Sequence, residues 1–125
     1  MYTHLEERLQ RLHDAHCAPL LRAGRKGLER ESLRVTPDNK LSQRPHPAGL
    51  GSPLTHPYIT TDYSEAQLEF VTPPFADMRD VLNFQHDIHA FTYARMADET
   101  LWSSSMPCIV HGESSVPIAQ FGSSN

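Results

Sequence analysis

The chain has 125 residues, 38% of them hydrophobic and 21% charged, with a formal net charge of −4. This composition favours one small globular domain over a disordered chain, and interleaved acids and bases without a basic stripe argue against nucleic acid as the main partner. No apolar run approaches the roughly 18–20 residues that a membrane-spanning helix needs, which argues against a membrane protein.

The N-terminal sequence and the cysteines indicate the compartment. The first ten residues, MYTHLEERLQ, carry charges where a secretory signal needs an apolar stretch, so we expect a cytoplasmic protein. Cys17 and Cys108 are too few for a disulfide framework and lack the spacing of a zinc site. We interpret both as reduced thiols, and Cys108 has no evident base to activate it as a nucleophile.

A first helix is predicted over residues 3–16. Its apolar stripe consists of Leu5, Leu9 and Leu12, which recur at helical spacing. Thr3 and Glu6 have the spacing of a capping box at the start of this helix. Pro19 is expected to end or bend it, because proline lacks the N–H group that continues a helix.

The first strand is predicted over residues 26–36. One face is expected to carry Glu29, Glu31, Leu33 and Val35, and the other Leu28, Arg30 and Arg34. The apolar residues at the end of the first face suggest that this face is half-buried, which is an unusual place for two carboxylates. The two arginines of the other face are expected to make structural pairs.

The middle of the chain is predicted to hold a turn at 37–40, an irregular proline-rich connection at 41–57 and two strands. The strands are residues 58–62, which are rich in β-formers, and residues 66–72, which alternate. In the second of these, one face is expected to carry Gln67, Glu69 and Val71, and the other Leu68 and Phe70.

The longest helix is predicted over residues 78–99, with Asp77 as its N-cap. Its apolar stripe is expected to contain Val81, Leu82, Phe84, Ile88, Phe91, Thr92, Arg95 and Met96. The order of helix, three strands and helix favours an α+β fold in which an antiparallel sheet is flanked by helices. Three strands make a poor free-standing sheet, so further strands are expected.

Four acids in apolar-flanked strands form the candidate site. They are Glu29, Glu31, Asp62 and Glu69. Neighbouring carboxylates repel and burial disfavours their ionisation, so such a cluster needs arginine partners or divalent cations. An all-oxygen cluster favours Mg²⁺ or Mn²⁺ over zinc, and these ions neutralise phosphate charge in phosphoryl transfer. The alternative is that the acids simply face water on an open side of the sheet.

Histidines offer weaker candidate sites. His86 and His89 are three residues apart on the long helix and could share a ligand, but no third ligand is evident, so solvent-facing side chains are the favoured interpretation. His46 and His56 lie in the proline-rich connection, where we expect them to shape a loop. Neither a P-loop nor a Rossmann glycine motif is present in the sequence, so neither kind of nucleotide site is supported.

Five segments carry a family resemblance. They are GLERESLRV at 27–35; HP at 46–47 with LGS at 50–52 and LTH at 54–56; ITTDYSEA at 59–66 with LEF at 68–70; LW at 101–102 with SMPC at 105–108; and IAQFGSSN at 118–125. In this order and spacing, the segments together resemble the bacterial glutamate–cysteine ligases (gamma-glutamylcysteine synthetases) of the proteobacterial type.

The resemblance implies an ATP-dependent ligase that catalyses the first step of glutathione biosynthesis. In such enzymes ATP phosphorylates the γ-carboxylate of L-glutamate, and the amine of L-cysteine then attacks the γ-glutamyl phosphate to give γ-glutamylcysteine. The implied fold is glutamine synthetase-like, an antiparallel sheet curved into a funnel with metals inside. Carried over residue by residue, the resemblance implies that Glu29, Glu31, Asp62 and Glu69 hold Mg²⁺ (or Mn²⁺).

The resemblance also implies that residues 1–125 are the N-terminal portion of a single catalytic domain. Its parts are an N-terminal helix (1–21), strands carrying the acidic cluster (22–76), a long amphipathic helix (77–100) and a tail toward a missing region (101–125). Family chains are several times longer, so we expect a fragment that is inactive alone. Gln67 stands where the family often has a small or apolar residue. Two alternatives stay open: a non-catalytic binding or assembly module derived from such a ligase, and an unrelated acid-clustered phosphatase or nuclease.

Overall fold

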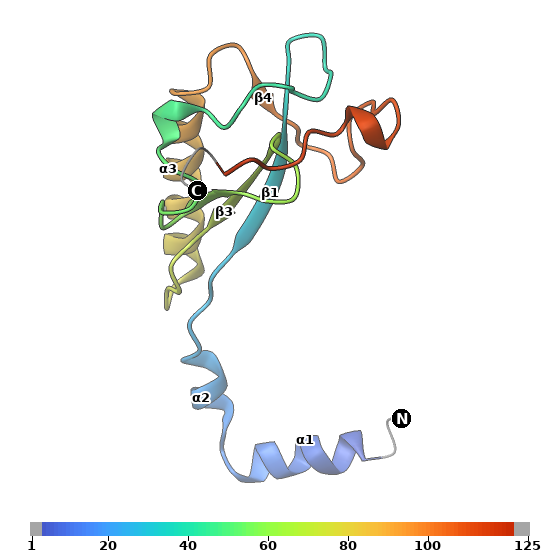
Figure 1. The fold of residues 1–125 in the computed structure, drawn as a ribbon. Coiled ribbons are helices and arrows are strands. Elements are labelled where there is room, and N and C mark those ends of the chain that lie inside the picture. Colours follow the sequence, from blue (N-terminus) through green and yellow to red (C-terminus); the bar gives the residue numbers. More distant parts are fainter. Residues whose placement is uncertain (1–3, 122–125) are drawn as a thin grey trace.

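Residues 4–121 are described by this computed structural model, and they form an antiparallel sheet with one long helix against one face (Figure 1). In chain order the elements are α1 (Leu5–Asp14), α2 (Ala18–Arg22), β1 (Glu29–Val35), the 3-10 helix η1 (Ala48–Leu50), β2 (Ile59–Thr61), β3 (Gln67–Val71), α3 (Met78–Tyr93), β4 (Thr100–Leu101) and the 3-10 helix η2 (Glu113–Ser115). The strand order is β2-β3-β1-β4, and each neighbouring pair is antiparallel. The predicted α+β fold is therefore confirmed. Among residues 4–121, none of the helices has the length and apolar character that a membrane span requires.

Each predicted strand is present, although each is shorter than predicted. The structure adds the strand β4, which pairs Leu101 with Arg34 and Thr100 with Val35 at the end of β1. A strand of two residues shows no alternation, so periodicity gave no sign of it. Its presence agrees with the expectation that three strands would not be the whole sheet.

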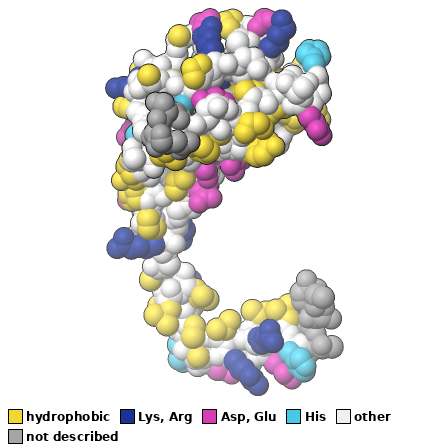
Figure 2. All heavy atoms as spheres, in the orientation of Figure 1, with side chains coloured by type: hydrophobic (Ala, Val, Ile, Leu, Met, Phe, Trp, Pro, Cys, Tyr) yellow, Lys and Arg dark blue, Asp and Glu magenta, His cyan; other side chains and the backbone are white. Residues whose placement is uncertain are grey.

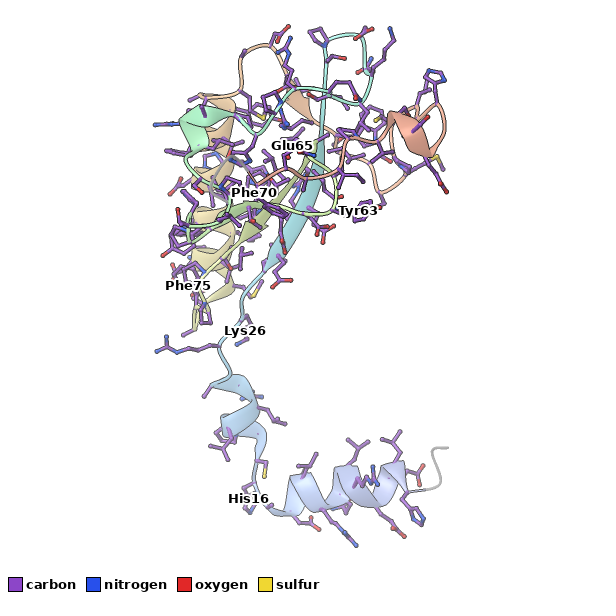
Figure 3. The ribbon with its side chains drawn as sticks, in the orientation of Figure 1. His16, Lys26, Tyr63, Glu65, Phe70 and Phe75 are labelled. Atoms are coloured by element: carbon purple, nitrogen blue, oxygen red, sulfur yellow. The ribbon has the colours of Figure 1, made fainter. Side chains whose placement is uncertain are left out.

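The hydrophobic core lies between the sheet and α3. Its buried members are Leu50, Ile59, Leu68, Phe70, Ile88, Met96 and Leu101. Phe70, labelled in Figure 3, is fully buried. Its ring lies against the imidazole of His89, with ring centroids 4.6 Å apart. Helix α3 begins as predicted after Asp77, whose carboxylate accepts a hydrogen bond from the N–H of Arg79 at 2.8 Å.

Helix α3 ends at Tyr93 and not at residue 99 as predicted. The chain turns there so that Met96 enters the core and Glu99 reaches the buried guanidinium of Arg34. The helical pattern of the sequence continues past this point, but these two long-range contacts stabilise the turn instead. The prediction was wrong because it counted local periodicity alone.

The buried side of α3 also differs from the predicted stripe. It consists of Val81, Gln85, Ile88 and Thr92. Leu82 and Phe91 of the predicted stripe are exposed. The hydroxyl of Thr92 is satisfied inside the helix, because it donates to the carbonyl of Ile88 at 2.8 Å, so a polar residue occupies a buried position at little cost.

Helices α1 and α2 extend away from the sheet and α3 (Figure 1), and none of their residues is buried. The first helix covers Leu5–Asp14 within the predicted range 3–16, and its predicted cap Thr3 lies outside the described residues. Pro19 does not end this helix. It lies in the first turn of α2, where a missing N–H is tolerated. Figure 2 shows apolar side chains along α1 and α2 on the surface.

Candidate metal-binding face

The four predicted acids lie on one face of the sheet, opposite the face that packs against α3. Glu29 and Glu31 come from β1, Glu69 comes from β3, and Asp62 directly follows β2. In the register of β1 and β3, Glu31 stands directly opposite Glu69, which places such Cβ atoms about 4.5–5.5 Å apart. Asp62 is held nearby because its N–H donates to the carbonyl of Gln67 at 3.0 Å. We call these four residues the acidic face.

The carboxylates of the acidic face repel one another electrostatically. Burial raises the pKa of Glu69, and the charges of Asp62, Glu29 and Glu31 raise this pKa further. None of the four takes part in an ion pair within residues 4–121. Figure 2 shows acidic side chains gathered over β1, on the underside of the part that holds the sheet. This surface therefore concentrates negative charge without a basic partner among the described residues.

The acidic face is more open than the sequence pattern suggested. The two acids on β1 are exposed, and the other two are half-buried. Val35 shares their side of β1 but packs with Leu41, Ala66 and Cys108, so this side of the strand is covered at its end and open at its start. The prediction of a half-buried face was wrong for Glu29 and Glu31, because the apolar residues that motivated it belong to the covered end of β1.

The donor chemistry of the acidic face fits a hard dication such as Mg²⁺ or Mn²⁺, because every donor is a carboxylate oxygen. The positions of the four carboxylates fit a metal ion less well. Within residues 4–121, no three His, Cys, Asp or Glu side chains lie close enough together to hold a metal ion. The structure brings the four acids to one surface but not to one point.

A hollow of about 260 Å³ adjoins the acidic face. Its walls include Glu31, Gln67, Trp102, Ser104 and Ser105. The indole Nε1 of Trp102 donates to the carbonyl of Met106 at 2.6 Å and so holds the serine-rich loop in place. Elsewhere in the lining, the amide Nε2 of Gln67 donates to the Oε2 atom of Glu31 at 2.6 Å. The hollow therefore offers hydroxyl groups, an amide and a carboxylate beside the acidic face.

A buried polar network fixes the turn between β2 and β3. Arg34 is fully buried, and it donates from Nη1 to Glu99 and from Nη2 to the carbonyl of Glu65, both at 2.8 Å. Glu65 is labelled in Figure 3. Its carboxylate accepts the N–H of His46 at 2.8 Å and that of Gln120 at 2.7 Å. Three segments that are distant in sequence are thereby tied to the turn that follows Asp62.

The structural pair predicted for Arg34 is confirmed, whereas Arg30 has a different contact. The Nε atom of Arg30 donates to the hydroxyl of Ser32 at 3.4 Å. The network around Glu65 was missed in the sequence analysis. Its two backbone partners are 19 and 55 residues away along the chain, and no local pattern signals contacts of that range.

The two histidines of α3 lie in different surroundings. His86 is exposed, with its Nδ1 atom 3.3 Å from Asp87. His89 faces the core, where its Nδ1 atom donates to the carbonyl of Gln85 at 2.6 Å, and burial lowers the pKa of its imidazole. The expectation of a solvent-facing side chain is right for His86 and wrong for His89.

The histidines of the proline-rich connection shape that loop, as predicted. His56 accepts the N–H groups of Tyr58 at 3.1 Å and Ile59 at 2.9 Å on its Nδ1 atom. The Nδ1 atom of His46 lies 2.8 Å from the hydroxyl of Thr61. These contacts hold the connection against the start of β2.

Both cysteines are free thiols. Cys108 is buried, and this burial raises the pKa of its thiol. A raised pKa leaves less of the reactive thiolate at neutral pH, which agrees with the expectation that Cys108 is not a nucleophile.

The chain is similar to glutamate–cysteine ligases along nearly all of its length. A family model described as "Glutamate-cysteine ligase" matches residues 9–125. The chain is 52% identical over 122 residues to the glutamate–cysteine ligase of Alcanivorax borkumensis, covering 98% of this chain and 23% of that protein. It is 51% identical over 114 residues to the same enzyme of Saccharophagus degradans, covering 91% of this chain and 22% of that one. The chain thus spans less than a quarter of the length of these curated relatives.

Two solved structures share the fold. The glutamate–cysteine ligase of Francisella tularensis in complex with AMP matches with a TM-score of 0.73 and 39% identity, over 78% of this chain and 20% of that one. A bifunctional glutathione synthetase from Pasteurella multocida matches with a TM-score of 0.79 and 36% identity, over 87% of this chain and 15% of that one.

Proposed function

Because this chain belongs to the glutamate–cysteine ligase family, we propose that it forms the metal-holding part of an ATP-dependent ligase that joins the γ-carboxyl group of L-glutamate to L-cysteine. The product, γ-glutamylcysteine, is the first intermediate of glutathione biosynthesis. The AMP bound to the Francisella tularensis enzyme supports an adenine nucleotide as co-substrate. We place the reaction in the cytoplasm, with Mg²⁺ or Mn²⁺ as the metal.

The proposed reaction has two steps. In the first, a γ-carboxylate oxygen of glutamate bonds to the terminal phosphorus of ATP, and ADP leaves. In the second, the cysteine nitrogen bonds to the acyl carbon, phosphate leaves, and the nitrogen loses a proton. A bound dication supplies charge neutralisation on the phosphate oxygens. The role of this chain is to hold that charge in position with Glu29, Glu31, Asp62 and Glu69.

One observation carries this proposal: the carboxylates of three separate segments share one face, without an ion-pair partner in the described part of the chain. Like charges directly opposite each other in a sheet, such as Glu31 and Glu69, are destabilising. A surface that faced only water would gain nothing from this arrangement. A surface that binds a dication needs it.

The 125 residues are proposed to be inactive by themselves. The acidic face does not bring three ligands together within residues 4–121, and the curated relatives contain far more sequence than this chain matches. The metal site and the substrate contacts are therefore proposed to be completed by family segments that the chain does not match.

The test uses a hybrid ligase, in which this chain replaces the corresponding 122 residues of the Alcanivorax borkumensis enzyme. Glu29→Gln in the hybrid removes one negative charge at nearly constant shape. We expect ligase activity at limiting Mg²⁺ to fall by more than about 100-fold, because the loss of a ligand exceeds the loss of a supporting contact. Formation of γ-glutamylcysteine is measured against Mg²⁺ concentration.

Glu6→Gln is the matched control, because Glu6 is an exposed acid on α1. It should leave the Mg²⁺ dependence unchanged. Unchanged activity in the Glu29→Gln hybrid would remove Glu29 from the proposed metal site. Hydrolysis of a phosphate ester by the 125-residue chain alone would instead favour the phosphatase or nuclease alternative.

A further inference from the structure

The first half of β1 has an open edge. Its two neighbours in the sheet are β3 on one side and β4 on the other. β3 pairs with β1 from Glu29 to Leu33, whereas β4 pairs only with the last two residues of β1. The N–H of Trp102 adds one hydrogen bond to the carbonyl of Leu33, at 2.8 Å, after β4 ends. In the described part of the chain, no strand therefore lies on this side of residues 29–32, where β1 leads from the sheet toward α2 (Figure 1).

The backbone groups that point to the open edge are those of Glu29 and Glu31. In an antiparallel ladder, bonded pairs alternate with non-bonded pairs, so every second residue turns its N–H and C=O groups away from the neighbouring strand. The carbonyl of Leu28 accepts the N–H of Thr72, which follows β3, at 2.9 Å. The N–H of Arg34 donates at 2.7 Å to the carbonyl of the residue before β3, in the same alternation. Even-numbered residues thus bond toward β3, and the two glutamates face away from it.

This edge has the chemistry that binds an extended segment. Unpaired N–H and C=O groups along a strand are a template for a further strand, and main-chain hydrogen bonds then supply the affinity. The side chains of residues 29–31 are exposed, so little of the described chain packs on this stretch. A partner strand can therefore pair with Glu29 and Glu31 without displacing another element.

A second copy of the chain is a poor occupant of the edge. Residues that stand opposite each other in an antiparallel pair lie on the same face of the sheet. If two copies paired about a twofold axis centred on Arg30, Glu29 of each copy would stand opposite Glu31 of the other. Like charges directly opposite are destabilising. The segment that fits is one without carboxylates at the two positions opposite Glu29 and Glu31.

We propose that the open edge of β1 pairs with an extended strand from the part of the ligase that lies outside this chain, and that this strand carries no acid opposite Glu29 or Glu31. The chain covers only 23% of the Alcanivorax borkumensis relative, so most of that protein is available to supply the strand. The inference rests on the proposed function, because it takes the chain to act within a complete ligase. It goes beyond that function by naming the surface at which the rest of the ligase joins and the kind of segment that joins there.

Hydrogen exchange at single amides tests the inference, because alternate residues of one strand give opposite expectations. Exchange is followed by mass spectrometry with electron-transfer fragmentation, in the 125-residue chain and in the hybrid ligase. The amides of Arg30 and Ser32 bond toward β3, so they should be protected in both proteins. The amides of Glu29 and Glu31 should exchange more than about 100-fold more slowly in the hybrid than in the 125-residue chain, because an amide inside a sheet exchanges only when the sheet opens.

Two proline variants provide a second measurement. Proline removes an N–H group, so a sheet tolerates it only where that group is not paired with another strand. Glu31→Pro should leave the thermal midpoint of the 125-residue chain nearly unchanged and lower that of the hybrid by at least about 4 °C. Arg30→Pro is the matched control, because the N–H of Arg30 bonds toward β3, and it should lower the midpoint of both proteins.

The outcomes separate the inference from the proposed function. Rapid exchange at Glu29 and Glu31 in a hybrid that makes γ-glutamylcysteine would overturn the inference and leave the proposed function standing. Slow exchange at both amides in a hybrid without ligase activity would support the paired strand and count against the proposed function. Protection in the 125-residue chain that grows with protein concentration would overturn the inference in favour of a second copy. The natural Alcanivorax borkumensis enzyme is measured at the aligned amides as well, so that an unstable hybrid does not decide the outcome.

Discussion

The two faces of the sheet are built from the same strands and differ in their physical character. On β3, Phe70 points toward α3 and is fully buried, while its neighbour Glu69 points to the acidic face among other carboxylates. The packed face supplies favourable burial, and the acidic face supplies repulsion. The comparison shows that alternation along a strand lets one segment provide stability and a charged surface at once.

The stabilisation from apolar burial on the packed face is larger than the destabilisation from charge repulsion on the acidic face. Full burial of a large apolar side chain stabilises a fold by about 1.5–3 kcal/mol, and this face carries several such side chains, including Leu68, Phe70 and Ile59. A pair of like charges directly opposite in a sheet opposes folding by roughly 0.2–1 kcal/mol. The packed face can therefore stabilise the sheet despite the repulsion on its other side.

The largest effect is expected from Phe70→Ala on the packed face. Removing a fully buried ring leaves a cavity between β3 and α3, and such changes lower the free energy of unfolding by about 3–5 kcal/mol. Urea unfolding followed by circular dichroism measures the loss. Tyr63→Ala is the control, because Tyr63 (labelled in Figure 3) is exposed, with a relative accessible surface of 70%. This variant should change stability by no more than about 0.5 kcal/mol. Equal losses in the two variants would contradict the contrast between the faces.

Local sequence patterns predicted the strands, the faces of β3 and the cap at Asp77, because each depends on residues close together in the chain. The end of α3 and the strand β4 were not predictable in this way. Both depend on contacts of Glu99 and Leu101 with β1, about 65 residues earlier in the chain. Periodicity also misassigned the buried side of α3, because Gln85 is polar and yet buried.

The candidate site was predictable in part. Alternation placed Glu29 with Glu31 and separated Glu69 from Phe70, but it cannot give the register that puts Glu31 opposite Glu69. Nor could it show that the covered end of β1 lies beyond the acids. The hydrogen bond from the Gln67 amide to Glu31 depends on this register and on a side-chain rotamer. The sequence could therefore show that Gln67 is unusual for the family, but not what it contacts.

Glu69→Gln on the acidic face is expected to raise the free energy of unfolding, by less than Phe70→Ala lowers it. Because the pKa of Glu69 is raised in the folded chain, the folded state binds the proton more tightly and ionisation destabilises the fold. This destabilisation is absent below about pH 4.3, the ordinary glutamate value, and is complete once the pH exceeds the raised pKa. The variant should therefore be more stable than the parent chain at pH 7, by less than about 1 kcal/mol because the carboxylate is partly hydrated.

Urea unfolding of the Glu69→Gln chain at pH 7 and at pH 4 checks this expectation. The gain in stability should disappear at the lower pH, where the parent carboxyl group is protonated as well. A loss of stability at pH 7 would mean that Glu69 makes a stabilising contact on this face, and the acidic face would then not be a surface of uncompensated repulsion.

The smallest change in the free energy of unfolding is expected from the titration of His89 on the packed face. Burial lowers the pKa of His89, the charges of Arg30 and His86 lower it further, and the bond to Gln85 partly opposes this. Its Nε2 atom is buried without a hydrogen-bond partner in the described part of the chain, so a proton there would add a poorly solvated charge beside Phe70. A histidine with a lowered pKa contributes stability above about pH 6.5 that is lost as the pH falls through the lowered value.

Unfolding measured from pH 7 to pH 5 should therefore show a smaller loss of stability in His89→Phe than in the parent chain. A residual loss is expected in the variant, because the pKa of His46 is lowered by burial as well. His13→Phe is the control, since His13 is exposed on α1 and does not act on His89, and it should follow the parent. Lowering the pH thus acts on the two faces in opposite directions: protonation relieves repulsion at Glu69 and introduces an unsatisfied charge at His89. Identical pH profiles of stability for the parent and His89→Phe would show that protonation of His89 does not destabilise the packed face. The contrast between the faces would then rest on Glu69 alone.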